Sequence, residues 1–186
     1  MVSKKAFAEA VRSLLDEGFR FTVIGGSIVE LALGRKDLGD DIDVFGEKPS
    51  PVVEEEEYAR VAEEHGWTLG QTWLGTPRLL LRAGNEEVPV EFYDNIYDFY
   101  VPEEILARAG KTRVSGVTVR MVSLEDHIVL KANAGRGSDI ERLKEIARLA
   151  NKGKLRVDPE KLREAASLFD DEQVILRRLR DAGFKL

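Results

Sequence analysis

Asp41 and Asp43 stand one residue apart in a short apolar run of the sequence. In a β-strand the side chains of residues i and i+2 point to the same face, so the two carboxylates would project together, roughly 6.5 Å apart along the strand. Aspartate is depleted in strands, and two like charges on one face repel each other unless a cation lies between them. A strand end with solvent-facing aspartates is the alternative. We interpret the pair as ligands of a divalent cation.

A glycine turn, Gly25-Gly26-Ser27, precedes the aspartates and lies between an apolar strand and a segment of helix length. Glycine lets a phosphate approach the backbone, a helix N-terminus offers N–H donors, and the Ser27 hydroxyl adds another donor. Taken alone, such a turn is more often only a tight connection. A dinucleotide site is excluded because the Gly-x-Gly-x-x-Gly fingerprint is missing. Together with the aspartates, the turn predicts a site for metal and phosphate.

Two-metal sites for phosphoryl or nucleotidyl transfer usually need a third carboxylate on a neighbouring strand. Glu91 is the candidate, because it lies in a later apolar run in which alternate residues point to opposite faces. Asp94 is the second choice, since it falls past the end of that strand. The alternative for Glu91 is an exposed position on an edge strand, which Pro89 would suit because proline cannot donate a ladder hydrogen bond.

Hydrophobic periodicity and turn residues predict a mixture of strands and helices up to about residue 122, followed by helices only. Ser123 begins a capping-box pattern at this change. We therefore expect two domains, residues 1–122 and 123–186, the second a small helical bundle. The strands are expected at 20–24, 41–45, 67–74, 78–82, 88–93, 112–114 and 117–122. The helices are expected at 3–17, 26–34, 51–66, just after 102, and at 123–134, 138–151, from 158 onward and 171–182.

The composition is that of a globular protein with an unusually charged surface. Hydrophobic residues make up 43% and charged residues 33%, against a usual quarter for the charged share. Glutamine occurs twice, asparagine four times and cysteine never, a pattern typical of proteins from hot environments. The lack of cysteine excludes disulfides and thiolate metal sites.

No apolar run is long enough to span a membrane, and the amphipathic N-terminal segment does not resemble a signal peptide, so we expect a cytoplasmic protein. The net charge of −6 argues against indiscriminate nucleic-acid binding. The charge is uneven, however: residues 1–130 carry 14 Lys/Arg and 24 Asp/Glu, and residues 131–186 carry 14 and 10. The basic part could attract a polyanion, or could simply carry salt-bridged helix surfaces.

The glycine turn, the Asp41/Asp43 pair and Glu91 together resemble the nucleotidyltransferase superfamily typified by DNA polymerase β. This resemblance implies an α+β fold in which helices back a mixed sheet. It also implies transfer of a nucleoside monophosphate from an NTP, such as ATP, with Mg²⁺ or Mn²⁺ as cofactor. Asp41, Asp43 and Glu91 would be the catalytic and metal-binding residues, and Gly25, Gly26 and Ser27 would bind the nucleotide.

The helical region resembles the Lys-and-Asp motif of the AbiEii-like branch, which includes toxins paired with antitoxins. By this resemblance Lys131 would bind the nucleotide's phosphates, and Asp139 would orient Lys131 or the nucleotide. A solvated helix lysine and a helix-start aspartate are the alternative. The match covers about two-thirds of the chain. It departs from the family where Asp40 follows Leu-Gly instead of the usual Ser or Thr, and where Glu91 replaces the commoner aspartate.

The acceptor is expected to be a hydroxyl group on an RNA 3′ end, a protein side chain or a small molecule such as an aminoglycoside. Overall acidity disfavours long nucleic acids, whereas the basic C-terminal part favours a tRNA-like end. Two other functions are consistent with the same residues. One is a toxin-type nucleotidyltransferase held inactive by an antitoxin-like partner, and the other is a catalytically silent nucleotide-binding module.

Overall fold

The computed structural model describes residues 1–186, which form two compact units. The first unit contains Met1–Tyr100 and Ala109–Met121, and the second contains Val101–Arg108 and Val122–Leu186. The predicted division into domains 1–122 and 123–186 stays a prediction. The compact units differ from it in one respect, because residues 101–108 belong to the second unit although the chain on both sides of them belongs to the first.

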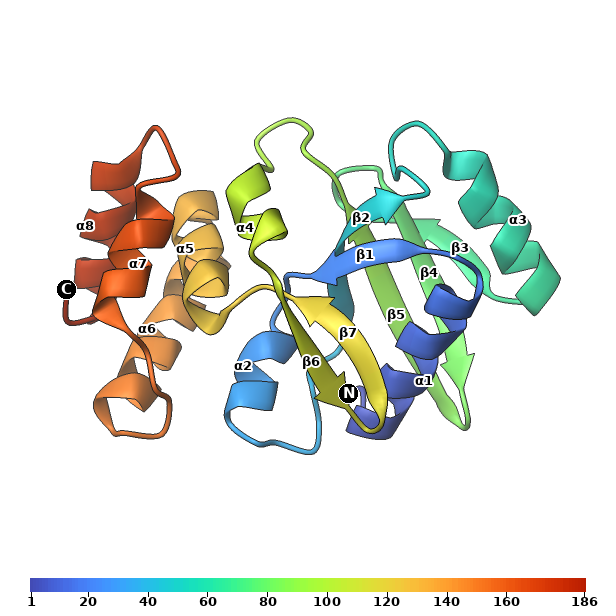
Figure 1. The fold of residues 1–186 in the computed structure, drawn as a ribbon, viewed down its shortest axis with the longest axis horizontal. Helices are drawn as coiled ribbons and strands as arrows, with labels where there is room; N and C mark the ends of the chain where they lie inside the picture. The colour runs from blue at the N-terminus through green and yellow to red at the C-terminus, as the bar shows by residue number, and fades with distance from the viewer. The chain divides into compact units, whose positions relative to one another are not determined.

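The first unit is built on a seven-stranded sheet with the order β3-β4-β5-β2-β1-β7-β6 (Figure 1). Strand β2 is parallel to β5, and β1 is parallel to β7, while the other neighbours are antiparallel. The predicted mixed sheet is therefore confirmed. The strands are β1 Arg20–Val23, β2 Ile42–Lys48, β3 Thr68–Gln71, β4 Pro77–Ala83, β5 Glu86–Tyr93, β6 Gly110–Val114 and β7 Val117–Met121.

Three helices belong to this unit: α1 Lys4–Asp16, α2 Ser27–Ala32 and α3 Glu55–His65. Helix α3 begins four residues later than the sequence predicted. The Ser50 hydroxyl accepts hydrogen bonds from the N–H groups of Val52 and Val53, and the Ser50 N–H donates one to the Glu54 carboxylate. Ser50 therefore organises a turn rather than the first turn of the helix.

Helices α1 and α3 cover one face of the sheet. The Ser3 hydroxyl, at the start of α1, donates to Glu86 of β5 at 2.7 Å. Tyr58 of α3 packs against Phe92 of β5, with ring centroids 4.9 Å apart. Because side chains alternate along a strand, Glu86 and Phe92 share the helix-covered face, and Glu91 projects from the opposite one.

The second unit consists of helices, as predicted for the C-terminal part (Figure 1). The Ser123 hydroxyl accepts the Asp126 N–H at the start of α5, and Asp158 accepts the Glu160 N–H at the start of α7. Glu125 adds a partly buried hydrogen bond by accepting from the N–H of Asp158. No helix of the protein is both long and apolar enough to cross a lipid bilayer. The helices are α4 Glu103–Ala107, α5 Leu124–Ala134, α6 Gly137–Asn151, α7 Pro159–Ala166 and α8 Glu172–Ala182.

Candidate active site

The pairing of β2 with β5 determines how the candidate carboxylates meet. The two strands are parallel, and Asp43 lies directly opposite Glu91 in their register. Strand β5 has β4 on one side and β2 on the other, so the edge-strand alternative for Glu91 is wrong. Asp41 immediately precedes β2 and lies two residues before Asp43. Carboxylates that are 48 positions apart in the chain thus share one face of one sheet.

Asp41, Asp43 and Glu91 each offer a carboxylate oxygen, and these oxygens lie within 4.8 Å of one another. Oxygens that bind one Mg²⁺ at about 2.1 Å can be at most about 4.2 Å apart, so small side-chain rotations suffice to complete such a shell. Asp94 is outside this group, and its carboxylate accepts the N–H of Asn95 at 2.7 Å. The geometry fits a divalent cation held by hard oxygen ligands.

Electrostatics at this cluster favours the arrival of positive charge. Burial, then the negative charges of Glu91 and Asp40, raise the pKa of the half-buried Asp41 carboxyl above its ordinary value. The guanidinium of Arg78 opposes these effects only in part. A bound cation would stabilise the ionised carboxylates that now repel one another.

Arg78 and Tyr93 are functional candidates that sequence reasoning missed. The Arg78 Nε–H donates to one oxygen of Glu91 at 3.1 Å, and the Tyr93 hydroxyl donates to the other at 2.5 Å. Tyr93 follows Glu91 by two residues, so its shared face was readable from strand periodicity. Arg78 lies opposite Glu91 on the antiparallel neighbour β4, a pairing that the two-residue turn Gly84-Asn85 between the strands could have indicated. Burial, then the hydrogen bond to Glu91, raise the pKa of Tyr93.

The two glycines between β1 and α2 have different surroundings. A β-carbon at Gly25 would lie 2.5 Å from the Cβ of Asp43 and would overlap its carboxylate, so only glycine leaves Asp43 its place. A β-carbon at Gly26 would meet nothing within 4 Å. The Ser27 hydroxyl is buried and has no hydrogen-bond partner. Helix α2 has six residues, so its dipole contributes less to anion binding than the sequence suggested.

Lys131 and Asp139 belong to the second unit, where the structure brings them together. The carboxylate of Asp139 accepts from Lys131 Nζ at 3.0 Å and from Arg136 Nε at 2.7 Å. Burial of Asp139 acts to raise its pKa, but the hydrogen bonds and charges of the two cations outweigh it and hold the pKa below its ordinary value. The aspartate thus joins α5 to the start of α6.

The sequence matches one family model over residues 3–181, that of the nucleotidyl transferases of unknown function (DUF2204). The chain belongs to this family. It is a nucleotidyltransferase, and the predicted superfamily is confirmed, whereas the predicted link to the AbiEii-like branch stays a prediction. No curated protein matches the sequence.

Three solved structures resemble this chain at low sequence identity. A nucleotidyltransferase-like antigenic protein from Paracoccidioides brasiliensis is 17% identical in sequence, with a TM-score of 0.51. The match covers 100% of this chain and 96% of that protein's chain. ANT(2″)-Ia in complex with adenylyl-2″-tobramycin is 17% identical, with a TM-score of 0.42, and the match covers 96% of this chain and 97% of that one. The solution structure of the antibiotic-resistance factor ANT(2″)-Ia is 19% identical, with a TM-score of 0.44, and the match covers 94% of this chain and 89% of that one. Because the sequence identity is low, the similarity to the Paracoccidioides brasiliensis protein supports the fold and no more.

Proposed function

We propose that this nucleotidyltransferase transfers a nucleoside monophosphate from an NTP to an acceptor hydroxyl, with Mg²⁺ or Mn²⁺ held by Asp41, Asp43 and Glu91. The observation that carries the proposal is the meeting of three carboxylate oxygens within 4.8 Å on one face of the sheet. A cation bound there would neutralise phosphate charge and polarise the reacting phosphoryl group. The oxygen-only donor set and the raised pKa of Asp41 both support a divalent cation.

For Glu91, its surroundings favour the role of metal ligand over that of general base. Each of its oxygens already accepts one hydrogen bond, from Arg78 or from Tyr93. An ionised carboxylate has about four lone-pair directions, so about two stay available for a cation. The bonds that Glu91 accepts would persist while it binds metal, whereas a base must be free to take a proton from the acceptor.

The nucleotide's phosphates are proposed to bind at the glycine turn. For Lys131, in the second unit, phosphate binding is proposed from the family resemblance alone. The space beside Gly26 is open, and a buried hydroxyl without a partner, as at Ser27, costs about 1–3 kcal/mol that a ligand oxygen would recover. Lys131 is partly exposed, whereas Asp139 is buried and bonded to two cations. The role proposed for Asp139 is therefore to orient Lys131, not to contact the nucleotide.

A transfer assay tests the reaction and separates the acceptor classes. The protein is incubated with each α-labelled NTP, ATP included, and with Mg²⁺ or Mn²⁺. Total RNA, cellular protein or a pool of hydroxylated small molecules is supplied separately. We expect label on one of these acceptors, loss of transfer with EDTA, and at least a hundredfold loss in Asp41→Ala and Asp43→Ala, as for removal of a group that holds the reacting charges.

Asp40→Ala is the matched control, because Asp40 adjoins the pair but its side chain is 88% exposed. We expect its activity to stay within a few-fold of the wild type. Transfer that survives both Asp41→Ala and Asp43→Ala would overturn the site assignment. Label that appears only on a protein co-purified with the chain would instead favour a partner-regulated, toxin-type enzyme.

A further inference from the structure

Both the ring and the hydroxyl group of Tyr93 are held in place by neighbouring side chains. Its ring is buried and stacks on Phe99, with centroids 5.0 Å apart and planes 24° from parallel. These contacts fix the hydroxyl oxygen on the face of the sheet that carries Glu91.

The direction of the hydrogen bonds at Tyr93 follows from chemistry. A carboxylate oxygen can only accept, so the Tyr93 hydroxyl donates its proton to Glu91. The resulting bond to Glu91 measures 2.5 Å, at the short end of the range for O–H···O⁻ bonds to a carboxylate. Tyr93 is therefore a hydrogen-bond donor to the third carboxylate that its own ring packing holds in place.

We propose that Tyr93 is a positioning residue for the metal centre. Its hydroxyl fixes the orientation of the Glu91 carboxylate, whose remaining lone pairs would then be available to a cation that Asp41 and Asp43 would also hold. This inference rests on the metal site of the proposed function. Groups that hydrogen-bond to metal-binding side chains typically change metal affinity or activity by about 10–100-fold when they are removed.

Arg78 also bonds Glu91, but its substitution gives a mixed signal. The guanidinium orients the carboxylate, which favours metal binding, and its positive charge repels the cation, which opposes it. Tyr93 is neutral, so Tyr93→Phe removes one donor and leaves the charge of the site unchanged. Tyr93→Phe is therefore the sharper test.

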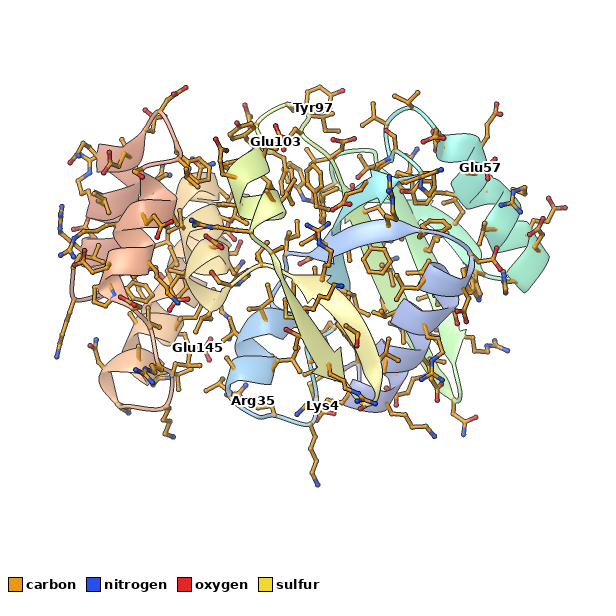
Figure 2. The ribbon with its side chains drawn as sticks, viewed as in Figure 1. Lys4, Arg35, Glu57, Tyr97, Glu103 and Glu145 are labelled. Carbon is orange, nitrogen blue, oxygen red and sulfur yellow. The ribbon has the colours of Figure 1, made fainter.

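Binding of Mn²⁺ alone to the full chain, followed by electron paramagnetic resonance of the free ion, gives a readout independent of catalysis. We expect Tyr93→Phe to bind Mn²⁺ about 10–100-fold more weakly than the wild type. Tyr97→Phe is the matched control, because Tyr97 lies on the loop after β5 and is 86% exposed (Figure 2), and it should bind as the wild type does. If Tyr93→Phe does not fold, Phe99→Leu serves as the test: it removes the stacked ring, keeps the Tyr93 hydroxyl, and should weaken binding in the same direction by a smaller factor.

Transfer kinetics distinguish positioning from a general structural defect. If Tyr93 acts through Glu91, Tyr93→Phe raises the metal concentration for half-maximal transfer, and excess metal restores most of kcat. A kcat that stays low at every metal concentration would overturn the positioning role.

The binding outcomes also separate this inference from the function on which it rests. Equal Mn²⁺ affinity in Tyr93→Phe and wild type, together with lost binding in Asp43→Asn, would overturn the role of Tyr93 and leave the metal site standing. A wild-type chain that binds no Mn²⁺ would overturn both.

Discussion

At the scale of single residues, Gly25 and Gly26 show how one turn can serve two purposes. The first glycine makes room for the Asp43 carboxylate, and the second leaves open space beside the backbone. Neither backbone conformation requires glycine, since neither has a positive φ. At Gly25 glycine is needed because any side chain would collide with Asp43, a residue 18 places further along the chain.

Alanine substitutions at the two glycines should therefore differ. Gly25→Ala would push Asp43 out of place, so we expect a loss of about 1–3 kcal/mol in the free energy of unfolding, as in other overpacked sites, and weaker Mn²⁺ binding. Gly26→Ala meets no neighbour and should change the free energy of unfolding by at most about 0.5–1 kcal/mol, with Mn²⁺ binding retained. Urea unfolding and Mn²⁺ titration measure both effects. Equal losses in the two variants would contradict the contact between Gly25 and Asp43.

Asp41 should make the metal-free protein less stable at neutral pH. Its folded-state pKa is raised above the ordinary 3.8, first by burial and then by Glu91 and Asp40. The folded state therefore keeps this proton to a higher pH than the unfolded state. The stability that protonated Asp41 contributes is fully present below pH 3.8 and is lost as the pH rises through the folded-state value.

We accordingly expect Asp41→Asn to be more stable than the wild type at pH 7 in EDTA, with the difference shrinking as the pH falls toward 3.8. Addition of Mn²⁺ should reverse the order, because only the wild type retains the full ligand set. Thermal melts from pH 4 to 8, with and without metal, measure both trends. An Asp41→Asn variant that is less stable in EDTA at pH 7 would show that repulsion does not dominate at this cluster.

At the scale of elements, the junction of α5 and α6 depends on one buried carboxylate. Helix α5 ends at Ala134 and is capped by Gly135 in the left-handed conformation, and α6 begins directly after Arg136. Asp139 in the first turn of α6 reaches back to Lys131 on α5 and to Arg136. The position suits a carboxylate because an acidic group near a helix N-terminus is also stabilised by the helix dipole.

Asp139→Asn should destabilise the protein by about 1–3 kcal/mol at neutral pH, since it weakens hydrogen bonds to two charged partners in a buried site. The pKa of Asp139 is lowered, so its contribution is present above the ordinary value of 3.8 and is lost as the pH falls through the folded-state value. The gap between variant and wild type should therefore close in acid. Asp181→Asn, at an exposed position on α8, is the control and should change stability by less than about 0.5 kcal/mol. A gap that persists in acid would assign the loss to packing instead of charge.

At the scale of the whole molecule, the chain passes from the first unit to the second, back, and across again. Residues 101–108 form the first passage and contribute α4 to the second unit. Val101 and Ile105 in this segment are fully buried. A cut after residue 122 would separate them from nearly all of the unit to which they belong.

A fragment of residues 1–122 should therefore expose apolar surface. We expect it to bind the dye ANS more strongly than the full chain does, and we expect Ile105→Ser to reduce that binding in the fragment. In the full chain the same substitution should cost about 2–5 kcal/mol, as for other large apolar side chains that are lost from a core. ANS fluorescence and urea unfolding are the measurements. A fragment that melts cooperatively without binding ANS would support an independent domain that ends at residue 122.

The charged composition predicts unusual resistance to heat. Charged residues make up 33% of the chain, and several form ion pairs one helical turn apart, such as Arg60 with both Glu57 and Glu64. Networks of this kind contribute most at high temperature, where the cost of desolvating charges falls. We expect a calorimetric Tm above the range of about 45–65 °C that is typical of mesophile domains. A Tm within that range would count against an origin in a hot environment.

Local patterns in the sequence were sufficient for the elements and for part of the site. Apolar spacing, capping residues such as Ser123 and turn glycines act over a few residues, so helices and strands were predictable to within a few positions. The shared face of Asp41 and Asp43 follows from the two-residue period of a strand. Glu91 entered as the third carboxylate because of its strand pattern and the resemblance to nucleotidyltransferases.

Only the tertiary structure decided how distant segments meet. The parallel register of β2 and β5 sets Asp43 opposite Glu91, and the antiparallel register of β4 brings Arg78 to the same carboxylate. The collision that reserves Gly25 for glycine also arises between separate strands and turns. The register of β4 on β5 follows from the two-residue turn between them, whereas the pairing of β2 with β5 joins segments far apart in the chain, and no local spacing encodes it. The sequence by itself determined which side chains could bind a metal, and the sheet decided that they do meet and that Tyr93 and Arg78 hold one of them.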